Sequence, residues 1–433
     1  MFKFLHAADL HLDSPLRGLD RYEGAPVEQI RGATRRALEN MVATAIEQRV
    51  SFVIVAGDVY DGNWQDFNTG LFFVKQMSRL REAGIPVILI SGNHDADSKM
   101  TRSLKLPDNV RTLATDRPQT LDGKDLGYGL EQLDVVFHGQ GFRSGAVDEN
   151  VVLNYPAARR GAFNIGVLHT SLDMEAGGEH ARYAPCAIAD LLAKQYDYWA
   201  LGHIHKRRVA HEDPLIVFPG NLQGRHIRET GEKGCVLVTV DTRGRPTWEF
   251  QPLDVLRWHE LKVSADDAAT ADEVLERCDL ELRRLVRDQG GLPLAVRVLV
   301  TGNCPAHREL AAAPDVWTNQ IRARALELGG GDVWIEKVKF QTAGPTAAEQ
   351  VAWEGPVQEI VSYCEELRRS DELLATLGAE LAALSRKLPA NLREDSLPGQ
   401  EPLRLDDPAY LRQAVSDVEP LLLARLWTRE GGR

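Results

Sequence analysis

The sequence has no long hydrophobic run and no segment of the kind that directs secretion. None of its apolar stretches reaches the roughly 18 residues that a membrane-spanning helix requires. The start, Met1 to His6, runs directly into Ala7-Ala8-Asp9 and lacks the apolar core and cleavage site of a signal peptide. These absences argue against a membrane protein, and we expect a cytoplasmic protein without a membrane partner.

Cysteine is also scarce. The 433 residues include five cysteines, and no two of them form a Cys-x-x-Cys pair. An odd number of scattered cysteines is typical of reduced, buried thiols and not of a disulfide framework. Because the motifs described below contain no cysteine, the sequence also disfavours a structural zinc site.

The chain has no excess of positive charge. Its formal net charge of −12 argues against non-specific coating of nucleic acid, although a local basic groove remains compatible with it. From residue 345 to the end, 10 Lys+Arg stand against 16 Asp+Glu, so half of the excess negative charge lies in the last fifth of the chain. The remainder is closer to neutral and can attract a polyanion once divalent cations are bound.

The length predicts two or three domains, and the first of them alternates β-rich and helical segments. Strands are predicted at Phe2–Ala8, Phe52–Ala56, Val87–Ser91, Val135–His138, Asn164–His169, Tyr198–Leu201, Leu215–Phe218, Val236–Val240 and Thr247–Gln251. Several are apolar at every position, as is typical of strands buried on both faces. Helices are predicted over Val27–Gln48, Asp66–Ala83 and Pro185–Lys194. We predict an α/β (α+β) domain over residues 1–256.

A smaller α+β domain is predicted over residues 257–344. Its expected elements are strand His259–Val263, helix Ala271–Arg287, strand Leu294–Thr301, helix Trp317–Leu328 and strand Val333–Phe340. Gly344-Pro345 indicates a hinge, and residues 345–433 read as helical. Their apolar stripe is explained equally well by packing on the chain's own domains and by a surface for a partner. The last helix is predicted over Tyr410–Leu426, with a kink at Pro420.

Metal-binding side chains directly follow five of the predicted strands. They are Asp9, His11, Asp58, Asn93, His169, His203 and His205. Taken singly they are ordinary, since Asp-x-His occurs by chance and Gly-Asp is often only a turn. Loops at one edge of a sheet bring together segments that are distant in the chain. The set therefore predicts a centre for two divalent cations in which Asp58 bridges both.

The donor set indicates the metal and the chemistry. We expect one cation to be held by Asp9, His11 and His205, and the other by Asn93, His169 and His203, with Asp58 shared. Mixed oxygen and nitrogen donors suit Mn²⁺, Fe²⁺ or Zn²⁺ better than Mg²⁺. Such a centre lowers the pKa of a bound water and neutralises phosphoryl oxygens, which predicts hydrolysis of a phosphate ester.

Two further residues are predicted to be catalytic. His94 follows Asn93 directly and is the expected general acid, or a group that stabilises the phosphoryl oxygens. Asp95 is expected to orient His94 by accepting a hydrogen bond from its ring. Basic residues expected to contact a phosphate backbone are Lys206, Arg207, Arg208 and Arg225, for which a solvated surface is the alternative explanation. His6 and His138, which lie within apolar strands, are expected to be core residues.

With these residues in this order, residues 1–256 resemble the calcineurin-like metallophosphoesterase superfamily, and within it the SbcD-type DNA repair nucleases. The matching segments are Leu5–Asp13, Tyr198–His205 and Pro219–Gln223. The resemblance implies a β-sandwich flanked by helices, two metal ions, usually Mn²⁺, and a capping domain that shapes access of DNA. It also implies a C-terminal helical element that docks on the coiled coil of an SbcC-like ABC-type ATPase, and a possible homodimer.

One departure from that family affects the expected activity. In part of the family a histidine that assists exonuclease action stands where this sequence has Asp61. Exonuclease and endonuclease cleavage therefore both stay open. A phosphodiesterase acting on a small nucleotide is the alternative function, although the 177 residues after Leu256 favour a nuclease subunit.

Overall fold

Two six-stranded mixed sheets form the framework of the N-terminal unit, which comprises residues 1–225 and 231–257. The first sheet has the order β12-β11-β1-β2-β3-β4, with β1 (Phe2–Ala7), β2 (Phe52–Ala56), β3 (Val87–Ile90), β4 (Val110–Thr112), β11 (Gly234–Val240) and β12 (Pro246–Pro252). The second has the order β5-β6-β7-β8-β10-β9, with β5 (Gln119–Asp122), β6 (Val135–Gly139), β7 (Phe163–His169), β8 (Tyr198–Gly202), β9 (Arg208–Glu212) and β10 (Leu215–Phe218). The computed structural model describes residues 1–14, 32–61, 67–97, 104–172, 183–329, 332–344, 356–388 and 403–430.

The sheets pack face to face between two outer layers. A core of residues from both sheets lies between them, and it is rich in aromatic rings. Phe4 stacks on Phe52 with ring centroids 4.8 Å apart, and Phe137 meets Phe52 edge-on at 4.9 Å. Such pairs add about 1 kcal/mol each to the free energy gained by burying their area. The expected β-sandwich is therefore confirmed.

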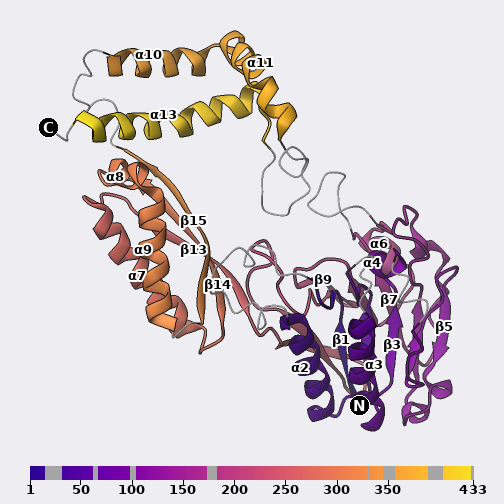
Figure 1. The fold of residues 1–433 in the computed structure, drawn as a ribbon. Helices are drawn as coiled ribbons and strands as arrows, with labels where there is room; N and C mark the ends of the chain where they lie inside the picture. Colours follow the sequence, from indigo (N-terminus) through magenta and orange to yellow (C-terminus); the bar gives the residue numbers. More distant parts are fainter. Residues whose placement is uncertain are drawn as a thin grey trace. The chain divides into compact units, whose positions relative to one another are not determined.

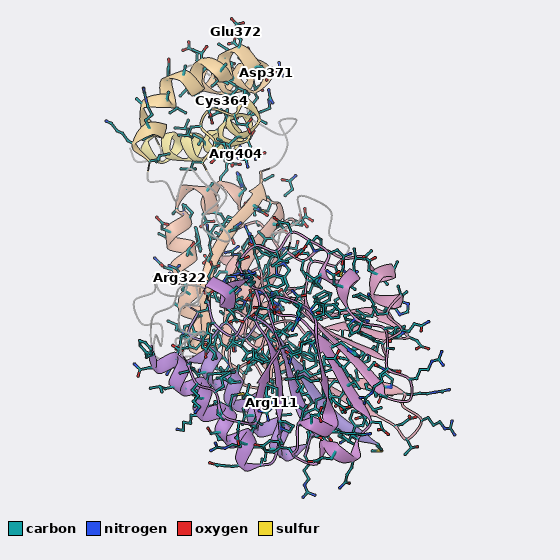
Figure 2. The ribbon with its side chains drawn as sticks, turned by 90° about the vertical axis from the view of Figure 1, so that its right-hand side faces the viewer. Arg111, Arg322, Cys364, Asp371, Glu372 and Arg404 are labelled. Atoms are coloured by element: carbon teal, nitrogen blue, oxygen red, sulfur yellow. The ribbon has the colours of Figure 1, made fainter. Side chains whose placement is uncertain are left out.

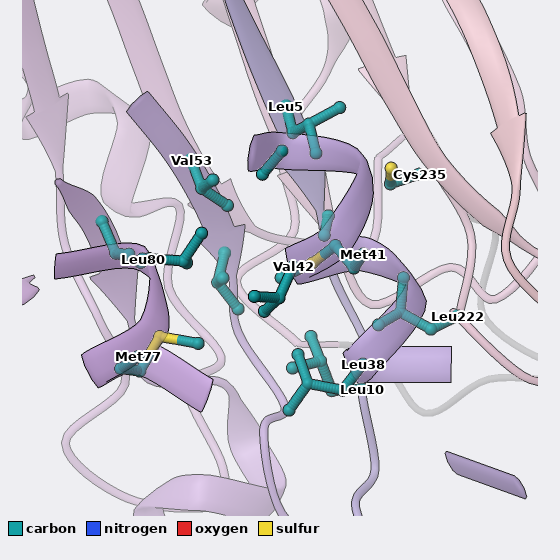
Figure 3. Packing of buried hydrophobic residues seen from close by; sticks show 14 of the residues in the cluster. Leu5, Leu10, Leu38, Met41, Val42, Val53, Met77, Leu80, Leu222 and Cys235 are labelled. Atoms are coloured by element: carbon teal, nitrogen blue, oxygen red, sulfur yellow. The ribbon is translucent and has the colours of Figure 1, made fainter. Parts of the chain in front are cut away.

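Helices α2 (Ala33–Glu47) and α3 (Phe67–Glu82) cover the outer face of the first sheet (Figure 1). Met41 of α2 and Met77 of α3 are fully buried against strand residues such as Val53 (Figure 3). The three- to four-residue spacing of apolar residues predicted α2 for this reason, whereas the end of α3 was predicted from Gly84 and Pro86. On the second sheet, the short helices η3 (Val151–Asn154) and α6 (Ile188–Leu192) enclose a further cluster around Trp199.

Strand direction decides where the motifs lie. β1 runs parallel to β2, and β2 runs parallel to β3. In the second sheet β7 runs parallel to β8. Because parallel strands end at the same edge of a sheet, the segments that follow these five strands converge.

The nine predicted strands are all present, but the prediction for this unit was incomplete. β4, β5 and β9 were not predicted, because their residues are mostly half-buried or exposed and form no continuous apolar run. The helix predicted over Pro185–Lys194 is wrong in extent, since only Ile188–Leu192 is helical and Cys186 instead forms a β-bridge with Leu172. The start of the predicted helix Val27–Gln48 lies outside the described residues.

The second unit comprises residues 226–230 and 258–433. Its three-stranded sheet has the order β13-β14-β15, with β13 (Arg257–Ser264), β14 (Leu294–Asn303) and β15 (Val333–Ala343). Helices α7 (Ala271–Asp288), α8 (His307–Ala312) and α9 (Pro314–Gly329) accompany it. The side chain of Thr270 accepts a hydrogen bond from the N–H of Glu273 and so caps α7 where the sequence predicted its start.

Three helices make up the described part of the tail: α10 (Pro356–Arg369), α11 (Asp371–Lys387) and α13 (Pro408–Glu430). Figure 2 labels Cys364 on α10 and Asp371 and Glu372 at the start of α11. Cys364 and Leu374 are buried, so part of the predicted apolar stripe packs within this unit. α13 contacts α8, α10 and α11, and it is not interrupted at Pro420.

Close packing of the tail depends on Gly378 of α11. A Cβ at this position would lie 3.1 Å from the carbonyl oxygen of Leu405 and 3.4 Å from Cδ1 of Leu411. Arg368 pairs with Glu419, which ties α10 to α13. Within the described part of the chain, no helix combines the length and the apolar character needed to cross a bilayer.

Candidate metal centre

The segments after β1, β2, β3, β7 and β8 meet in one place, held by backbone hydrogen bonds. The N–H of Asp9 donates to the carbonyl of Gly57 at 3.0 Å, and the N–H of His11 donates to that of Asp58 at 3.0 Å. The N–H of His203 donates to both carboxylate oxygens of Asp9 at 3.1 Å. The predicted convergence of these loops is therefore present in the fold.

Asp58 stands between two sets of potential ligands. On one side its Oδ2 is 3.9 Å from His11 Nε2, which in turn lies 3.1 Å from His205 Nε2. On the other side Oδ2 is 3.3 Å from His169 Nε2, and Asn93 Oδ1 lies 3.0 Å from that same nitrogen. Three groups of carboxylate and imidazole atoms, each within 4.8 Å of one another, are suited to a cation: Asp9, His11 and His205; Asp9, Asp58 and His169; and His11, Asp58 and His94.

Six of the seven predicted ligands take part in these contacts, and His203 is placed differently. Its ring lies edge-on to that of His169, with centroids 5.2 Å apart, and 5.5 Å from the ring of Tyr183. The groups of facing atoms do not include its imidazole. What His203 contributes in this geometry is its backbone N–H, which fixes the orientation of the Asp9 carboxylate.

Four of these residues have strained backbones. Asp9, His11, Asp58 and His203 have φ angles of 52°, 42°, 52° and 97°. Non-glycine residues adopt positive φ rarely and at a free-energy cost of about 1 kcal/mol or more, and such residues concentrate at functional sites. The surrounding hydrogen bonds therefore hold these side chains in positions that an unconstrained loop would avoid.

The glycines that precede the ligands leave no room for a side chain. A Cβ on Gly92 would lie 2.2 Å from Oδ1 of Asp58. One on Gly202 would lie 1.9 Å from the carbonyl oxygen of Ala56 and 2.9 Å from Nδ1 of His169. The Gly-Asn and Gly-His sequences are thus explained by close approach of the backbone to neighbouring ligands.

The centre concentrates buried charge. Burial, together with the nearby Asp58 carboxylate, raises the pKa of Asp9 to about 7. Burial also opposes ionisation of Asp58 and of His169, yet their mutual attraction holds the pKa of Asp58 well below its usual range and raises that of His169 to about 9. Fully buried carboxylates require a positive partner. The oxygen and nitrogen donors present here fit divalent cations in that role.

The contacts of His94 correct the prediction for Asp95. His94 Nδ1 lies 3.2 Å from Oδ1 of Asp61, not against Asp95. Asp95 instead accepts hydrogen bonds from the N–H groups of Val59, Tyr60 and Gly92 at 3.0–3.1 Å. The reason is local: Asn93–Asp97 forms the short helix α4, in which consecutive side chains diverge and the Asp95 carboxylate folds back onto the first turn.

From the sequence, Asp61 was identified only as a departure from a family pattern, but in the structure it contacts two residues of the centre. Besides His94, it lies 3.5 Å from His11 Nδ1 and accepts a hydrogen bond from the hydroxyl of Ser14 at 2.8 Å. Partial burial disfavours a charged His94, but the hydrogen bond to Asp61 and the negative charges of Asp58 and Asp61 together outweigh it and raise the pKa of His94. The signal that could have identified Asp61 is its place three residues after Asp58.

The basic residues fall into two groups. Lys206, Arg207 and Arg208 are exposed, and the Arg207 guanidinium lies 3.9 Å above the ring of Phe250. Arg225 is only 12% exposed, and its Nη2 lies 3.1 Å from His205 Nδ1. The buried Lys233, which sequence reasoning missed, donates to the carbonyl of His205 at 2.9 Å.

His6 and His138 are core residues, as predicted. Both are buried: His6 is 0% and His138 2% exposed. His6 Nδ1 lies 2.9 Å from the hydroxyl of Tyr198.

Comparison with known proteins agrees with this geometry. Residues 2–207 match the family described as calcineurin-like phosphoesterase, and residues 258–343 match the middle domain of the metallophosphoesterase YhaO. The protein named "Uncharacterized metallophosphoesterase YhaO" of Bacillus subtilis (strain 168) is 34% identical over 303 residues, which cover 70% of this chain and 72% of that protein. The chain belongs to the YhaO-like family of calcineurin-like metallophosphoesterases. This YhaO-like protein is therefore a metal-dependent phosphoester hydrolase.

Two other proteins with lower sequence identity are also similar to this YhaO-like chain. The DNA double-strand break repair protein Mre11 of Methanopyrus kandleri is 24% identical over 426 residues, covering 92% of this chain and 84% of that protein. A solved dimetal phosphatase from Danio rerio covers 58% of this chain and 99% of its own, at 11% identity and a TM-score of 0.33. The predicted superfamily is confirmed, whereas the SbcD-type assignment within it stays a prediction.

Proposed function

We propose that this YhaO-like protein is a two-metal phosphodiesterase that cleaves DNA, as the nuclease subunit of an SbcD-like repair complex. The observation that carries the proposal is the position of Asp58, whose Oδ2 lies 3.9 Å from His11 Nε2 and 3.3 Å from His169 Nε2. A carboxylate placed in this way is suited to bridge two cations.

The proposed ligands follow from that position. Asp9, His11 and His205 would hold one cation, and Asn93 and His169 the other, with Asp58 shared; His203 is kept in the second set on the sequence pattern alone. Mn²⁺ is the proposed metal, because hard oxygen and borderline nitrogen donors occur together; Fe²⁺ and Zn²⁺ suit the same set. When bound, such a pair supplies an acidified water and neutralises the phosphoryl oxygens.

The protein's own side chains then handle the leaving group. Breaking the P–O bond leaves an alkoxide that needs a proton, and His94 is the proposed donor through Nε2. Its Nδ1–H donates to Asp61, which fixes the tautomer and favours the charged ring. Asp61 is therefore a positioning residue. Asp95, which accepts three backbone N–H groups, is proposed to hold the loops after β2 and β3 in register.

Three observations favour DNA over a small nucleotide. Exposed Lys206 and Arg208 lie directly after His205, where a phosphate backbone could extend beyond the centre. The Mre11 relative, whose name assigns it to double-strand break repair, matches 92% of the chain. The second unit and the helical tail also exceed what hydrolysis of a small ester requires.

Comparing substrates tests this proposal. With Mn²⁺ present, we expect cleavage of linear duplex and hairpin DNA with a kcat/KM at least about tenfold above that for a cyclic nucleotide, because extra phosphate contacts strengthen binding. A chelator-treated sample serves as the control for metal dependence. Cleavage of a covalently closed hairpin identifies endonuclease action, and cleavage of open ends alone identifies exonuclease action. Hydrolysis of the cyclic nucleotide without DNA cleavage would contradict the proposal.

The tail is proposed to bind the coiled coil of an SbcC-like ABC-type ATPase. Its helices leave apolar side chains exposed, among them Tyr363, Leu384 and Val418, at 57%, 52% and 47%. An amphipathic helix pair of this kind suits docking on another helix.

Changing these exposed residues tests the tail separately from catalysis. We expect the double change Leu384→Glu and Val418→Glu to weaken co-purification with the co-expressed ATPase by about tenfold or more, since charge is introduced into an apolar contact. Hydrolysis of a small phosphodiester should be unchanged. Leu280→Glu on α7, where the leucine is 49% exposed, is the matched control. Undiminished ATPase binding by the double variant would reject this role.

A further inference from the structure

Arg225 lies inside the candidate metal centre, although the sequence predicted only a contact with the DNA backbone. Its Nη2 is 3.1 Å from His205 Nδ1, and its Nη1 is 3.9 Å from Oδ1 of Asp61. Asp61 also contacts His94, whose side chain is 40% exposed. The guanidinium therefore lies beside a proposed ligand, His205, and beside Asp61, the partner of the proposed general acid.

The hydrogen bond to His205 is incompatible with the proposed metal ligation. A guanidinium has donors only, so Nδ1 of His205 must offer a lone pair to accept from it. His205 Nε2 is the nitrogen that faces His11 and Asp9, at 3.1 and 3.9 Å. A neutral imidazole that binds a metal through Nε2 carries its proton on Nδ1. Two N–H donors would then face each other, so the contact with Arg225 has to break.

Electrostatic repulsion by a bound cation would also separate Arg225 from the centre. Without a cation, the guanidinium is a positive group close to the carboxylates of the centre. It lies close enough to lower the pKa values of Asp9, His11, Asp61 and His94. A divalent cation bound by the same groups would repel it. Arginine is also the side chain best shaped to bind a phosphate with two parallel hydrogen bonds.

We propose that Arg225 occupies the centre in place of metal charge, and that metal loading displaces its guanidinium onto the phosphoryl group of the substrate. The inference rests on the proposed two-metal function and adds a residue that binds the scissile phosphate. It makes Arg225 a competitor of the metal and a ligand of the phosphate. Removing the Arg225 side chain should consequently raise the affinity for the metal and lower the affinity for phosphate.

The experiment measures these two opposite changes in affinity. Arg225→Met keeps length and removes charge and donors. Titration of Mn²⁺ into the metal-free full-length protein should show binding about 3- to 10-fold tighter than in the wild type, because a like charge is gone. Inorganic phosphate should bind the Mn²⁺-loaded variant about 10- to 100-fold more weakly, as expected for a lost charge-assisted hydrogen bond.

Two variants serve as comparisons. Arg225→Lys keeps the charge without the planar fork, so Mn²⁺ affinity should stay near that of the wild type while phosphate binding weakens. Arg245→Met makes the same chemical change in the turn between β11 and β12, and should alter neither affinity. That exposed turn lies beside the start of β1, because Val240 pairs with Phe2, whereas Asp9 follows the other end of β1.

The outcomes separate this inference from the function on which it rests. Weaker or unchanged Mn²⁺ binding by Arg225→Met, in a protein that does bind Mn²⁺, overturns the inference alone. Failure of the wild type to bind Mn²⁺ overturns both. If Arg225→Met does not fold, the structure of the Mn²⁺-loaded wild type decides: separation of Arg225 from His205 supports the proposal, and an intact hydrogen bond overturns it.

Discussion

Replacing His94 by alanine should slow phosphodiester cleavage by about 10²- to 10⁴-fold, the range typical of a lost general acid. Metal content should change little, because the ring of His94 pairs with Asp61, its Nδ1 lying 3.2 Å from Oδ1. Cleavage rates and Mn²⁺ per protein should both be measured. His94 also belongs to one group of atoms suited to a cation, with His11 and Asp58. Loss of a cation together with activity would make it a ligand and not the acid.

The matched control for this substitution is His211→Ala. His211 lies on β9 and bonds to the carbonyl of Pro214 at 2.9 Å, outside the contacts of the centre. Its replacement should leave both the cleavage rate and the metal content unchanged. A similar loss in the control would show that the effect of His94→Ala is not specific to the site.

A pH profile distinguishes proton donation by His94 from a structural role. The general acid must be protonated, so the rate falls as pH rises through the pKa of His94. Asp61 raises that pKa, which keeps the active form present at higher pH. In Asp61→Asn the fall should therefore begin at lower pH, and the maximal rate should drop as the ring loses its partner. An unshifted alkaline limb would contradict the assignment.

Changing Asp58 to Asn should abolish binding of at least one cation and lower activity by about 10³-fold or more. The variant loses the negative charge of the carboxylate whose Oδ2 lies 3.9 Å from His11 Nε2 and 3.3 Å from His169 Nε2. Calorimetry with Mn²⁺ and the shift of the melting temperature on adding Mn²⁺ both report the loss, since a ligand stabilises only the fold that binds it.

Asp134→Asn is the control for this change. Asp134 pairs with Lys124 at 3.0 Å on the surface, where both side chains are more than half exposed. The control should retain the wild-type melting shift. An Asp58→Asn protein that still binds two Mn²⁺ ions with wild-type affinity would remove Asp58 from its proposed bridging position.

The sequence was most informative where strands and ligands coincide. Runs such as Val87–Ile90 are apolar throughout, so both their existence and the position of their ends could be predicted. Knowing that Asp58 lies just after one strand and that His169 ends another was enough to expect them together. A site that depends only on residue types and on the positions of strand ends can be predicted from the sequence in this way.

Contacts between side chains of different loops could not be predicted from the sequence. Asp95 is adjacent to His94 in the chain and was the natural partner, but the turn of α4 directs its carboxylate to the N–H groups of Val59, Tyr60 and Gly92. Asp61 reaches His94 only because the loops after β2 and β3 lie side by side. Arg225 reaches His205 across a separation of 20 residues. Such contacts depend on the paths of loops, which periodicity does not specify.

The three hydrogen bonds of Asp95 have a consequence for how the enzyme acquires its ions. They join the segments after β2 and β3 through the polypeptide alone, so the cage keeps its shape before any ion enters. Folding then comes first and loading second. Stripping the ions with a chelator and adding them back becomes a reversible exchange that needs no refolding, and the ion found in the cage reflects the supply in the cell as much as the selectivity of its donors.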